Sequence, residues 1–522
     1  MARGWSRRVE RGRSGRGAGG TAGGTAVTGA GGGLGTGGRP AGGAVLQTAR
    51  GVAVVAAVCL VAACTGGGGS SGTGQGPVTN SSGPPPMTLG ASPGTGSPPA
   101  AAWPEYGGDG GRTSVAAGLP AAGALSRRWA VHLDGAVYGQ PLVVGGLVIA
   151  ATENDSVYGL DESTGKVVWH SHLGTPVPRS ALHGCGNIFP LGITGTPAYD
   201  QANGLVYAVA EVIGYHHVLY GLAVSDGAVR VRRDVDIPSA ADNPAYNQQR
   251  PGLAITDGRV YVSFGGLAGD CGPYIGSVVG VALSGAGPLV YYRIPTTREG
   301  AVWGTAGPVA GPDGDLWIST GNGAAGPGDP YDGSDSVIRL SPDLRRISFF
   351  APSTWAADND GDLDLGSSQP VLAAGNAAFI MGKRGVGYLL DTLDLGGIGH
   401  ELAQLPICKA FGAGGVDGDT VYEPCSSGGM AAIAVSASQR TIRVLWRGPS
   451  DTNGSPVAGG GAVWVTSYSD TGGTLYELNP ANGAVRYQIA IGVGLPHFSS
   501  LSLASGTAFL GTLQGVVAID GV

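Results

Sequence analysis

The chain has 522 residues, of which 99 are glycine and 13% are charged, and its formal net charge is −7. The lysines and arginines of the later part are scattered and form no basic stripe, which excludes nucleic acid as an expected partner. The length is too great for one ordinary domain unless that domain is built from repeats.

The N-terminal part is predicted to be leader and tether. Residues 1–44 are rich in glycine and arginine and nearly free of large apolar side chains, so we expect them to be disordered. Residues 45–64 include an apolar run, Gly51–Ala63, which is too short to span about 30 Å of hydrocarbon as a helix and is typical of a signal peptide. Residues 65–125 are rich in Gly, Ser and Pro and are interpreted as a flexible tether.

The signal ends in Val61-Ala62-Ala63-Cys64, which resembles a bacterial lipobox. The resemblance implies that Cys64 is lipidated and that the chain is held on the extracytoplasmic face of the cell membrane. The alternative is an ordinary cleaved signal that happens to be followed by a cysteine. In either case the chain would be exported to a compartment that permits disulfides.

A short pattern recurs along the rest of the chain. In Val157–His170, VYGLDESTGKVVWH, an apolar run with a period of two stops at a polar turn and then restarts. The copies are spaced by about 40 to 60 residues, which is the period of a four-stranded propeller blade. The seven later copies are Leu219–Gly227, Ser277–Gly285, Ser336–Pro342, Gly387–Asp391, Met430–Val435, Thr474–Gly483 and Gly515–Gly521.

These repeats predict an all-β fold, an eight-bladed β-propeller of four-stranded antiparallel blades over residues 126–522. No segment has a sustained period of 3.6, which argues against a helical fold. Thr164-Gly165 is predicted to turn an outer hairpin and Trp169 to pack between neighbouring sheets. The last copy lacks a fourth strand, so Arg128–Leu133 is expected to close the eighth blade and remove its open edge.

Four cysteines remain once those of the signal and lipobox are set aside, and four cysteines allow three pairings. We favour Cys185 with Cys271 and Cys408 with Cys425, because each pair would join neighbouring repeats or strands. Such bridges would each contribute roughly 3 to 5 kcal/mol in the loop-entropy model.

The repeat resembles that of a known family. Leu160–Trp169, LDESTGKVVW, is similar to the A-x-D-x-x-T-G-K-x-x-W repeat of pyrroloquinoline quinone (PQQ) dehydrogenases, which are eight-bladed propellers, and Leu478–Val485 is a weaker copy. Non-catalytic propellers similar to the outer-membrane assembly scaffold share this repeat. The resemblance covers the chain from about residue 126 to its end.

Three motifs resemble the metal and quinone positions of those dehydrogenases. Ala208–Glu211 implies that Glu211 binds a metal, and Ser319-Thr-Gly-Asn-Gly implies the same for Asn322. Gly300-Ala-Val-Trp-Gly-Thr implies that Trp303 stacks beneath the quinone. Carboxylate and amide oxygens suit a hard cation such as calcium or a lanthanide.

Two further motifs resemble the catalytic aspartate and a quinone-binding lysine. Phe350–Trp355 leads into an acidic stretch in which either Asp362 or Asp364 would take the proton of an alcohol. Gly382–Asp391 implies that Lys383 contacts the quinone oxygens. The adjacent cysteine pair that lies beside the quinone in the enzymes is missing from this chain.

Each candidate also has a structural interpretation. Glu211 would form a hydrogen bond at a blade rim, Trp303 would pack between blades and Asn322 would occupy a turn. The acidic stretch would be a solvated or calcium-binding loop, and Lys383 an exposed turn residue. His216-His217 has no third ligand at a convincing spacing, so a zinc site is not expected.

Two functions follow from these patterns. The first is a monomeric binding module at the cell envelope whose central funnel takes a small ligand or an envelope protein. The second is a quinoprotein alcohol or polyol dehydrogenase that uses PQQ with calcium or a lanthanide. The sequence leaves enzymatic activity open, because repeat similarity fixes a fold and not a chemistry.

Overall fold

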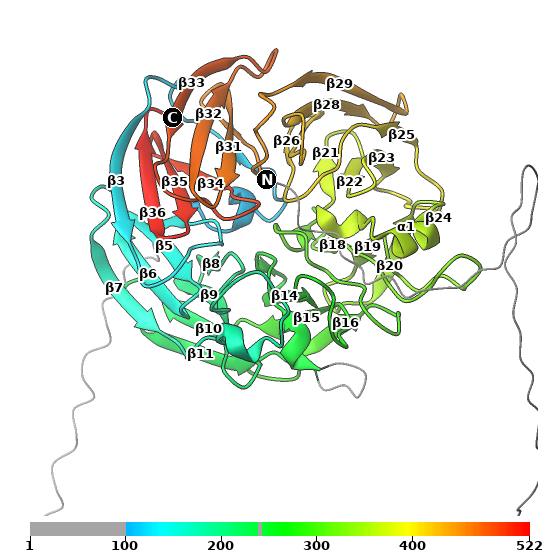
Figure 1. The fold of residues 1–522 in the computed structure, drawn as a ribbon, viewed down its shortest axis with the longest axis horizontal. Helices are drawn as coiled ribbons and strands as arrows, with labels where there is room; N and C mark the ends of the chain where they lie inside the picture. The colour runs from blue at the N-terminus through cyan, green and yellow to red at the C-terminus, as the bar shows by residue number, and fades with distance from the viewer. Residues whose placement is uncertain (1–100, 238–242) are drawn as a thin grey trace, which may run out of the picture. The chain divides into compact units, whose positions relative to one another are not determined.

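The computed structural model describes residues 101–237 and 243–522. These residues form eight sheets in a ring, so the predicted eight-bladed β-propeller is confirmed (Figure 1). We call the region around the axis of the ring, between the inner strands, the channel. The predicted signal, Cys64 and the tether up to residue 100 lie outside the described residues. Within the described ranges, no helix combines the length and the apolar character needed to cross a membrane.

The strands of each blade run from the channel to the rim, and the blades are numbered in chain order. Blade 1 consists of β1 (Ala101–Trp103), β4 (Leu142–Val144), β5 (Leu147–Thr152), β6 (Ser156–Asp161) and β7 (Val167–His172). Blade 2 consists of β8 (Ala198–Asp200), β9 (Leu205–Val212), β10 (His216–Ala223) and β11 (Val229–Asp234). Blade 3 consists of β12 (Asn247–Gln248) and β13 (Ala254–Thr256), both paired with β14 (Arg259–Gly266), then β15 (Ser277–Ala282) and β16 (Val290–Arg293). Blade 4 consists of β17 (Val309–Ala310), β18 (Leu316–Ser319), β19 (Val337–Leu340), β20 (Arg346–Ala351) and β24 (Gly397–Ile398).

The second half of the ring follows the same plan. Blade 5 consists of β21 (Val371–Ala373), β22 (Ala377–Met381), β23 (Val386–Asp391) and β25 (Ala403–Pro406). Blade 6 consists of β26 (Gly415–Asp417), β27 (Thr420–Glu423), β28 (Ala431–Ser436) and β29 (Thr441–Arg447). Blade 7 consists of β2 (Val115–Ala116), β30 (Val457–Gly459), β31 (Ala462–Ser469), β32 (Gly472–Leu478) and β33 (Val485–Ala490). Blade 8 consists of β34 (Leu501–Ala504), β35 (Thr507–Thr512), β36 (Gly515–Asp520) and β3 (Ser126–His132).

Helical structure in the described residues is short. The α-helix α1 (Trp355–Gly361) precedes blade 5. The single 3-10 turns are η1 (Tyr106–Gly108), η2 (Arg179–Ala181), η3 (Pro244–Tyr246) and η4 (Leu365–Ser367).

The outer hairpins follow the repeated sequence pattern. Strands β6 and β7 are joined by residues 162–166, and Gly165 has a φ of 70°, a left-handed conformation that glycine adopts without strain. Trp169 of β7 is buried, and its indole nitrogen donates a 2.8 Å hydrogen bond to the Val224 carbonyl at the end of the next blade's hairpin. The predicted turn and the packing of this tryptophan between sheets are both confirmed.

The same contact joins other neighbouring blades. Trp129 of blade 8 donates to the Glu162 carbonyl of blade 1 at 3.0 Å. Trp446 of blade 6 donates to the Pro480 carbonyl of blade 7 at 2.7 Å. An outer-strand tryptophan therefore fastens one blade to the turn of the next, which is why the repeat carries tryptophan and glycine at fixed positions.

The ring is closed by the N-terminal strand, as predicted. Strand β3 pairs antiparallel with β36, with Ala130 opposite Val517 and His132 opposite Gly515. Blade 8 therefore combines three strands from the end of the chain with one from its beginning, so the last sheet has no missing outer strand.

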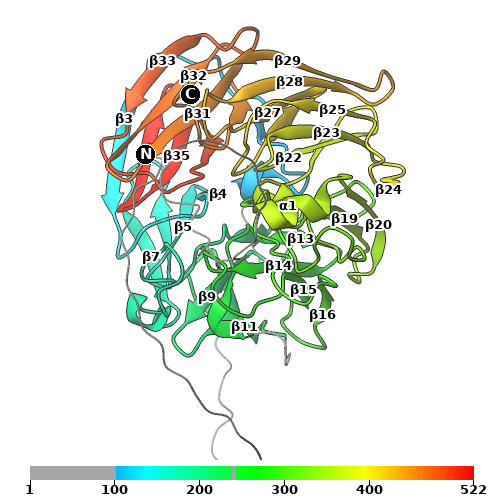
Figure 2. The same ribbon diagram turned by 45° about the vertical axis from the view of Figure 1, so that its right-hand side comes forward.

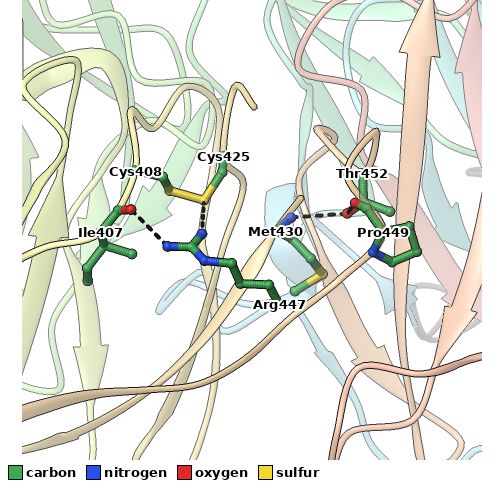
Figure 3. Close-up of a disulfide and its surroundings, with 7 residues drawn as sticks. All are labelled: Ile407, Cys408, Cys425, Met430, Arg447, Pro449 and Thr452. Atoms are coloured by element: carbon green, nitrogen blue, oxygen red, sulfur yellow. Dashed lines mark hydrogen bonds between the residues drawn. A yellow bond between two sulfur atoms is a disulfide. The ribbon is translucent and has the colours of Figure 1, made fainter. Parts of the chain in front are cut away.

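Both predicted disulfides are present. Cys185 lies between blades 1 and 2 and bonds to Cys271 of blade 3, with 6.1 Å between their Cα atoms. Cys408 and Cys425 join blades 5 and 6 with a Cα separation of 5.7 Å. Arg447 reaches across to the second bridge and donates a 2.8 Å hydrogen bond to the Ile407 carbonyl (Figure 3).

The N-terminal part of the described chain lies inside the channel. We call Ala101–Ala116 the channel segment; its strands lie near the centre of the ring in both ribbon views (Figure 1, Figure 2). Strand β1 pairs with β4 of blade 1, and β2 pairs in parallel with β30 of blade 7. The structure therefore differs from the predicted domain boundary at residue 126, because the glycine-rich stretch before it is packed against the inner strands.

Buried side chains hold the channel segment in place. Arg112 is 2% exposed, and its guanidinium donates to the Leu253 carbonyl at 2.7 Å and the Pro308 carbonyl at 3.3 Å, in blades 3 and 4. It also forms a 2.8 Å ion pair with Glu105. Trp103 donates from its indole nitrogen to Gln140 at 2.9 Å. These bonds join the segment to blades 1, 3 and 4, so it is packed against the inner strands instead of hanging free.

Candidate functional site

The predicted site residues lie at one end of the channel, which we call the mouth. Leaving aside the added strands β1, β2 and β12, the inner strand of each blade begins there and the next strand ends there, because these two strands are antiparallel. Glu211 is near the end of β9, Asn322 follows β18 and Lys383 follows β22. Residues that are far apart in sequence are therefore brought to the same end of the propeller.

Four of the six predicted residues form one polar cluster. The ammonium of Lys383 lies 2.8 Å from Asp362 Oδ1 and 2.5 Å from Asp364 Oδ2. Asn322 donates from its side-chain nitrogen to Asp362 at 2.8 Å and from its backbone nitrogen to Asp364 at 2.6 Å. The side chain of Asp364 is 8% exposed, whereas that of Asp362 is 42% exposed. Both candidates for the catalytic aspartate are thus paired with the same lysine.

Trp303 borders this cluster. The Lys383 ammonium lies 5.6 Å from the centroid of the Trp303 ring, a cation–π distance. The indole is partly exposed, and it lies in the connection before β17 and not between two sheets. Five of the six predicted residues are therefore neighbours.

The neighbours of Lys383 favour its charged form. Burial disfavours the ammonium, but Asp364 and then Asp362 raise the pKa of Lys383 above its usual range. Asp335 lies behind the cluster, and burial together with the charge of Asp364 raises the pKa of Asp335 well above its usual range. Lys383 therefore stays protonated and acts as a cation here, not as a nucleophile.

Glu211 takes part in a different set of contacts. It is 2% exposed and stands directly opposite His217 in the β9–β10 hairpin, with 3.3 Å between Oε2 and Nε2. The other ring nitrogen of His217 lies 2.7 Å from Asp236. Burial disfavours the charged imidazole, but Glu211 and Asp236 raise the pKa of His217 to about 10. The structure gives Glu211 no contact with Asn322 or with either aspartate of the cluster.

The donor groups of the cluster do not form a metal site. Among the described residues, no group of three or more His, Cys, Asp or Glu side chains is placed to hold a metal ion. The space between Asp362 and Asp364 is taken by the Lys383 ammonium, which already neutralises much of their charge. The side-chain oxygen of Asn322 is buried without a hydrogen-bond partner. That one amide oxygen does not make a metal site, so the residues as placed do not fit a bound cation.

Two aromatic side chains at the mouth were not found from the sequence. Phe411 and Phe498 stack with an interplanar angle of 5° and a centroid distance of 6.0 Å. Trp303 lies 6.5 Å from the first ring and 6.2 Å from the second. The three rings come from the connections that precede blades 4, 6 and 8. We call them the aromatic cup.

Their position explains why sequence patterns missed them. Phe411 and Phe498 each precede a short inner strand and belong to no repeated motif, whereas Trp303 was found from its own motif. Phe498 has a φ of 63°, which is strained for a side chain of this size. Only the ring closure brings the three together.

A small cavity opens beside the cup. Its volume is about 20 Å³, enough for an ordered water molecule. Tyr106 of the channel segment lines it, together with residues of the blade connections. The channel segment therefore forms part of the floor of the mouth.

Comparisons with known proteins agree with this architecture. Residues 107–265 match the family model described as outer membrane protein assembly factor BamB. No curated protein sequence gives a significant match.

Several solved structures share the fold. A quinohemoprotein alcohol dehydrogenase from Pseudomonas putida HK5 aligns with a TM-score of 0.63 at 13% identity, covering 80% of each chain. A europium-containing methanol dehydrogenase aligns with a TM-score of 0.60 at 13% identity, covering 80% of this chain and 97% of that one. BamB from Moraxella catarrhalis aligns with a TM-score of 0.53 at 15% identity, covering 76% of this chain and 99% of the other. The chain is thus an eight-bladed propeller whose residues 107–265 are similar to the BamB family model, and its fold is similar both to quinoprotein dehydrogenases and to BamB.

Proposed function

We propose that this chain is a binding module at the extracytoplasmic face of the cell membrane, held there by a lipid on Cys64, and that its mouth binds a small planar molecule. The observation that supports this most strongly is the aromatic cup. Three rings from three blades lie next to one another and leave Trp303 and Phe411 partly exposed. Aromatic faces stack on planar ligands, and partly exposed rings in a concave site are typical of small-molecule recognition.

The floor of the mouth supports the same proposal. Tyr106 of the channel segment lines the cavity beside the cup, so a ligand that entered the mouth would meet this side chain. A concave site removes more of a ligand's surface from water than a flat one does, which favours binding.

A titration with PQQ in metal-free buffer tests this proposal, since PQQ is a planar acid of suitable type. We expect saturable binding by calorimetry that weakens about tenfold in Trp303→Leu, the loss of roughly 1.4 kcal/mol of stacking. Tyr487→Leu, a change on the exposed outer strand β33, is the matched control and should bind as the wild type does. Equal affinities of Trp303→Leu and the wild type for PQQ would contradict a role of the aromatic cup in binding.

A quinoprotein dehydrogenase is the second candidate function. The observation that favours it is the grouping of Asn322, Asp362, Asp364, Lys383 and Trp303, which match the dehydrogenase motifs in residue type and order. This candidate requires that PQQ binding depend on calcium or lanthanum. It also requires that the chain oxidise alcohols with a dye as the electron acceptor. Dye reduction that is absent across alcohols, with PQQ and both metals supplied, would leave only the binding module.

A further inference from the structure

Each of the two disulfides joins a buried cysteine to one that solvent can reach. Cys185 is 3% exposed and bonds to Cys271, which is exposed. Cys425 is 1% exposed and bonds to Cys408, which is partly exposed. An external thiolate attacks a disulfide at the sulfur that it can reach, and the other sulfur leaves. In both bridges the buried cysteine is therefore the leaving group.

The two leaving sulfurs have different surroundings. No N–H or O–H group of the described residues donates to the sulfur of Cys185. Cys425 also packs among apolar side chains, but Arg447 donates from Nη1 to its Sγ at 3.5 Å (Figure 3). A neighbouring cation stabilises a thiolate, and apolar surroundings disfavour it. The apolar side chains that pack with Cys185 are those of Val177, Leu182, Ile188, Leu191 and Leu267.

Arg447 is fixed beside the second bridge. It ends β29 of blade 6, and its Nη2 donates a 2.8 Å hydrogen bond to the carbonyl of Ile407, the residue before Cys408 in the connection after blade 5. The guanidinium therefore spans the same gap between blades as the disulfide does. Within the described ranges, no carboxylate forms an ion pair with Arg447, so its charge is available to a thiolate on Cys425.

We propose that Cys408 is a site of thiol modification, at which a small external thiol forms a mixed disulfide. The incoming thiolate attacks Cys408 Sγ and forms the new S–S bond. The bond between Cys408 and Cys425 breaks, and its electron pair leaves with Cys425 as a thiolate, which the Arg447 guanidinium stabilises. One disulfide replaces another, so the thiol is the only co-reactant. The proposal is independent of any ligand at the mouth.

The test uses the full chain and reduced glutathione as the probe. Samples taken over time are quenched with excess N-ethylmaleimide, which caps free thiols, and the peptides are mapped by mass spectrometry. We expect glutathione on Cys408 and the maleimide cap on Cys425. Glutathione on Cys425, or no reaction of this bridge in the native chain, would overturn the proposal.

Variants of Arg447 separate a stabilised leaving group from a structural contact. In Arg447→Met, modification of Cys408 is expected to be about tenfold slower, because the Cys425 thiolate loses its cation. Arg447→Lys keeps the charge and should recover much of the rate. A guanidinium that only fastened the Ile407 carbonyl would have the opposite effect, since its loss would loosen the bridge and speed the reaction.

The Cys185–Cys271 bridge serves as the matched control within the same molecule. Its rate of reaction with glutathione should be the same in the wild type and in both variants, because Arg447 does not contact it. If Arg447→Met does not fold, Arg447→Gln removes the charge while keeping N–H donors and should also slow the reaction. An unchanged or faster modification of Cys408 in the uncharged variant would contradict the proposal.

Discussion

Carboxyl groups at the ends of second strands are unusually well buried in this propeller. Glu423 ends β27 with no exposed surface, and neither of its carboxylate oxygens has a hydrogen-bond partner among the described residues. Burial raises the pKa of Glu423 to about 8. A group whose folded-state pKa is raised contributes stability below its unfolded value of about 4.5 and loses that contribution as the pH rises toward 8.

Glu423→Gln is therefore expected to change stability in a pH-dependent way. Glutamine does not titrate, so the variant should match the wild type near pH 4.5 and exceed its free energy of unfolding by roughly 4 kcal/mol at pH 8. Urea unfolding at both pH values measures this difference. Glu162→Gln, in the turn after β6, serves as the control and should show no such trend. A constant difference across the pH range would mean that Glu423 is ionised in the folded chain.

At the scale of elements, the blade contacts depend on a tryptophan and the glycine that faces it. Gly227, with a φ of 71°, lies against Trp169 so closely that an added Cβ would be 2.5 Å from the ring carbon Cε3. Gly258 has a φ of 70°, and a Cβ added there would have no atom within 4 Å. The two glycines thus share a backbone conformation and differ in packing.

Gly227→Ala and Gly258→Ala separate these two effects. Both changes place alanine in a left-handed conformation, which costs about 1 kcal/mol. Gly227→Ala must also displace Trp169, and overpacking of this kind adds roughly 1 to 3 kcal/mol. The thermal unfolding temperature of Gly227→Ala should therefore be well below that of Gly258→Ala. Equal losses would show that the tryptophan contact does not limit the packing of blades 1 and 2.

The channel segment is a second element whose role can be isolated. Arg112→Met removes the guanidinium that bonds blades 3 and 4 and leaves Glu105 unpaired in a buried site. Breaking a buried ion pair on one side is strongly destabilising, by about 3 to 5 kcal/mol. The double change Arg112→Met with Glu105→Gln should recover part of this loss. Hydrogen exchange at the Val416 and Ala458 amides, which donate to the segment, should quicken in the single variant. Unchanged exchange there would contradict a packed channel segment.

At the scale of the whole molecule, local patterns predicted the ring and long-range contacts decided the site. Alternating runs such as Val157–Asp161 predict strands because their period of two is a property of the strand itself. The closing strand was predictable because the last repeat lacked a partner and one alternating segment was left over. The repeat spacing then fixed eight blades.

The remainder could not be derived in this way. The channel segment is glycine-rich and has no period, and the burial of Arg112 depends on carbonyls more than 140 positions away. The match of Glu211 to a metal-binding motif did not reveal that His217 faces it across the hairpin. Phe498 and Arg250 belong to no motif, and only the folded ring brings Phe498 beside Trp303 and Arg250 over the Phe498 ring.

The central claim is that the aromatic cup at the mouth binds a small planar molecule. Native mass spectrometry of the chain purified from its own cells tests this most directly, with Trp303→Leu prepared in parallel. We expect the wild type to carry one additional small molecule per chain, released on denaturation, and the variant to lack it. The same mass excess in both proteins, or none in either, would contradict the claim.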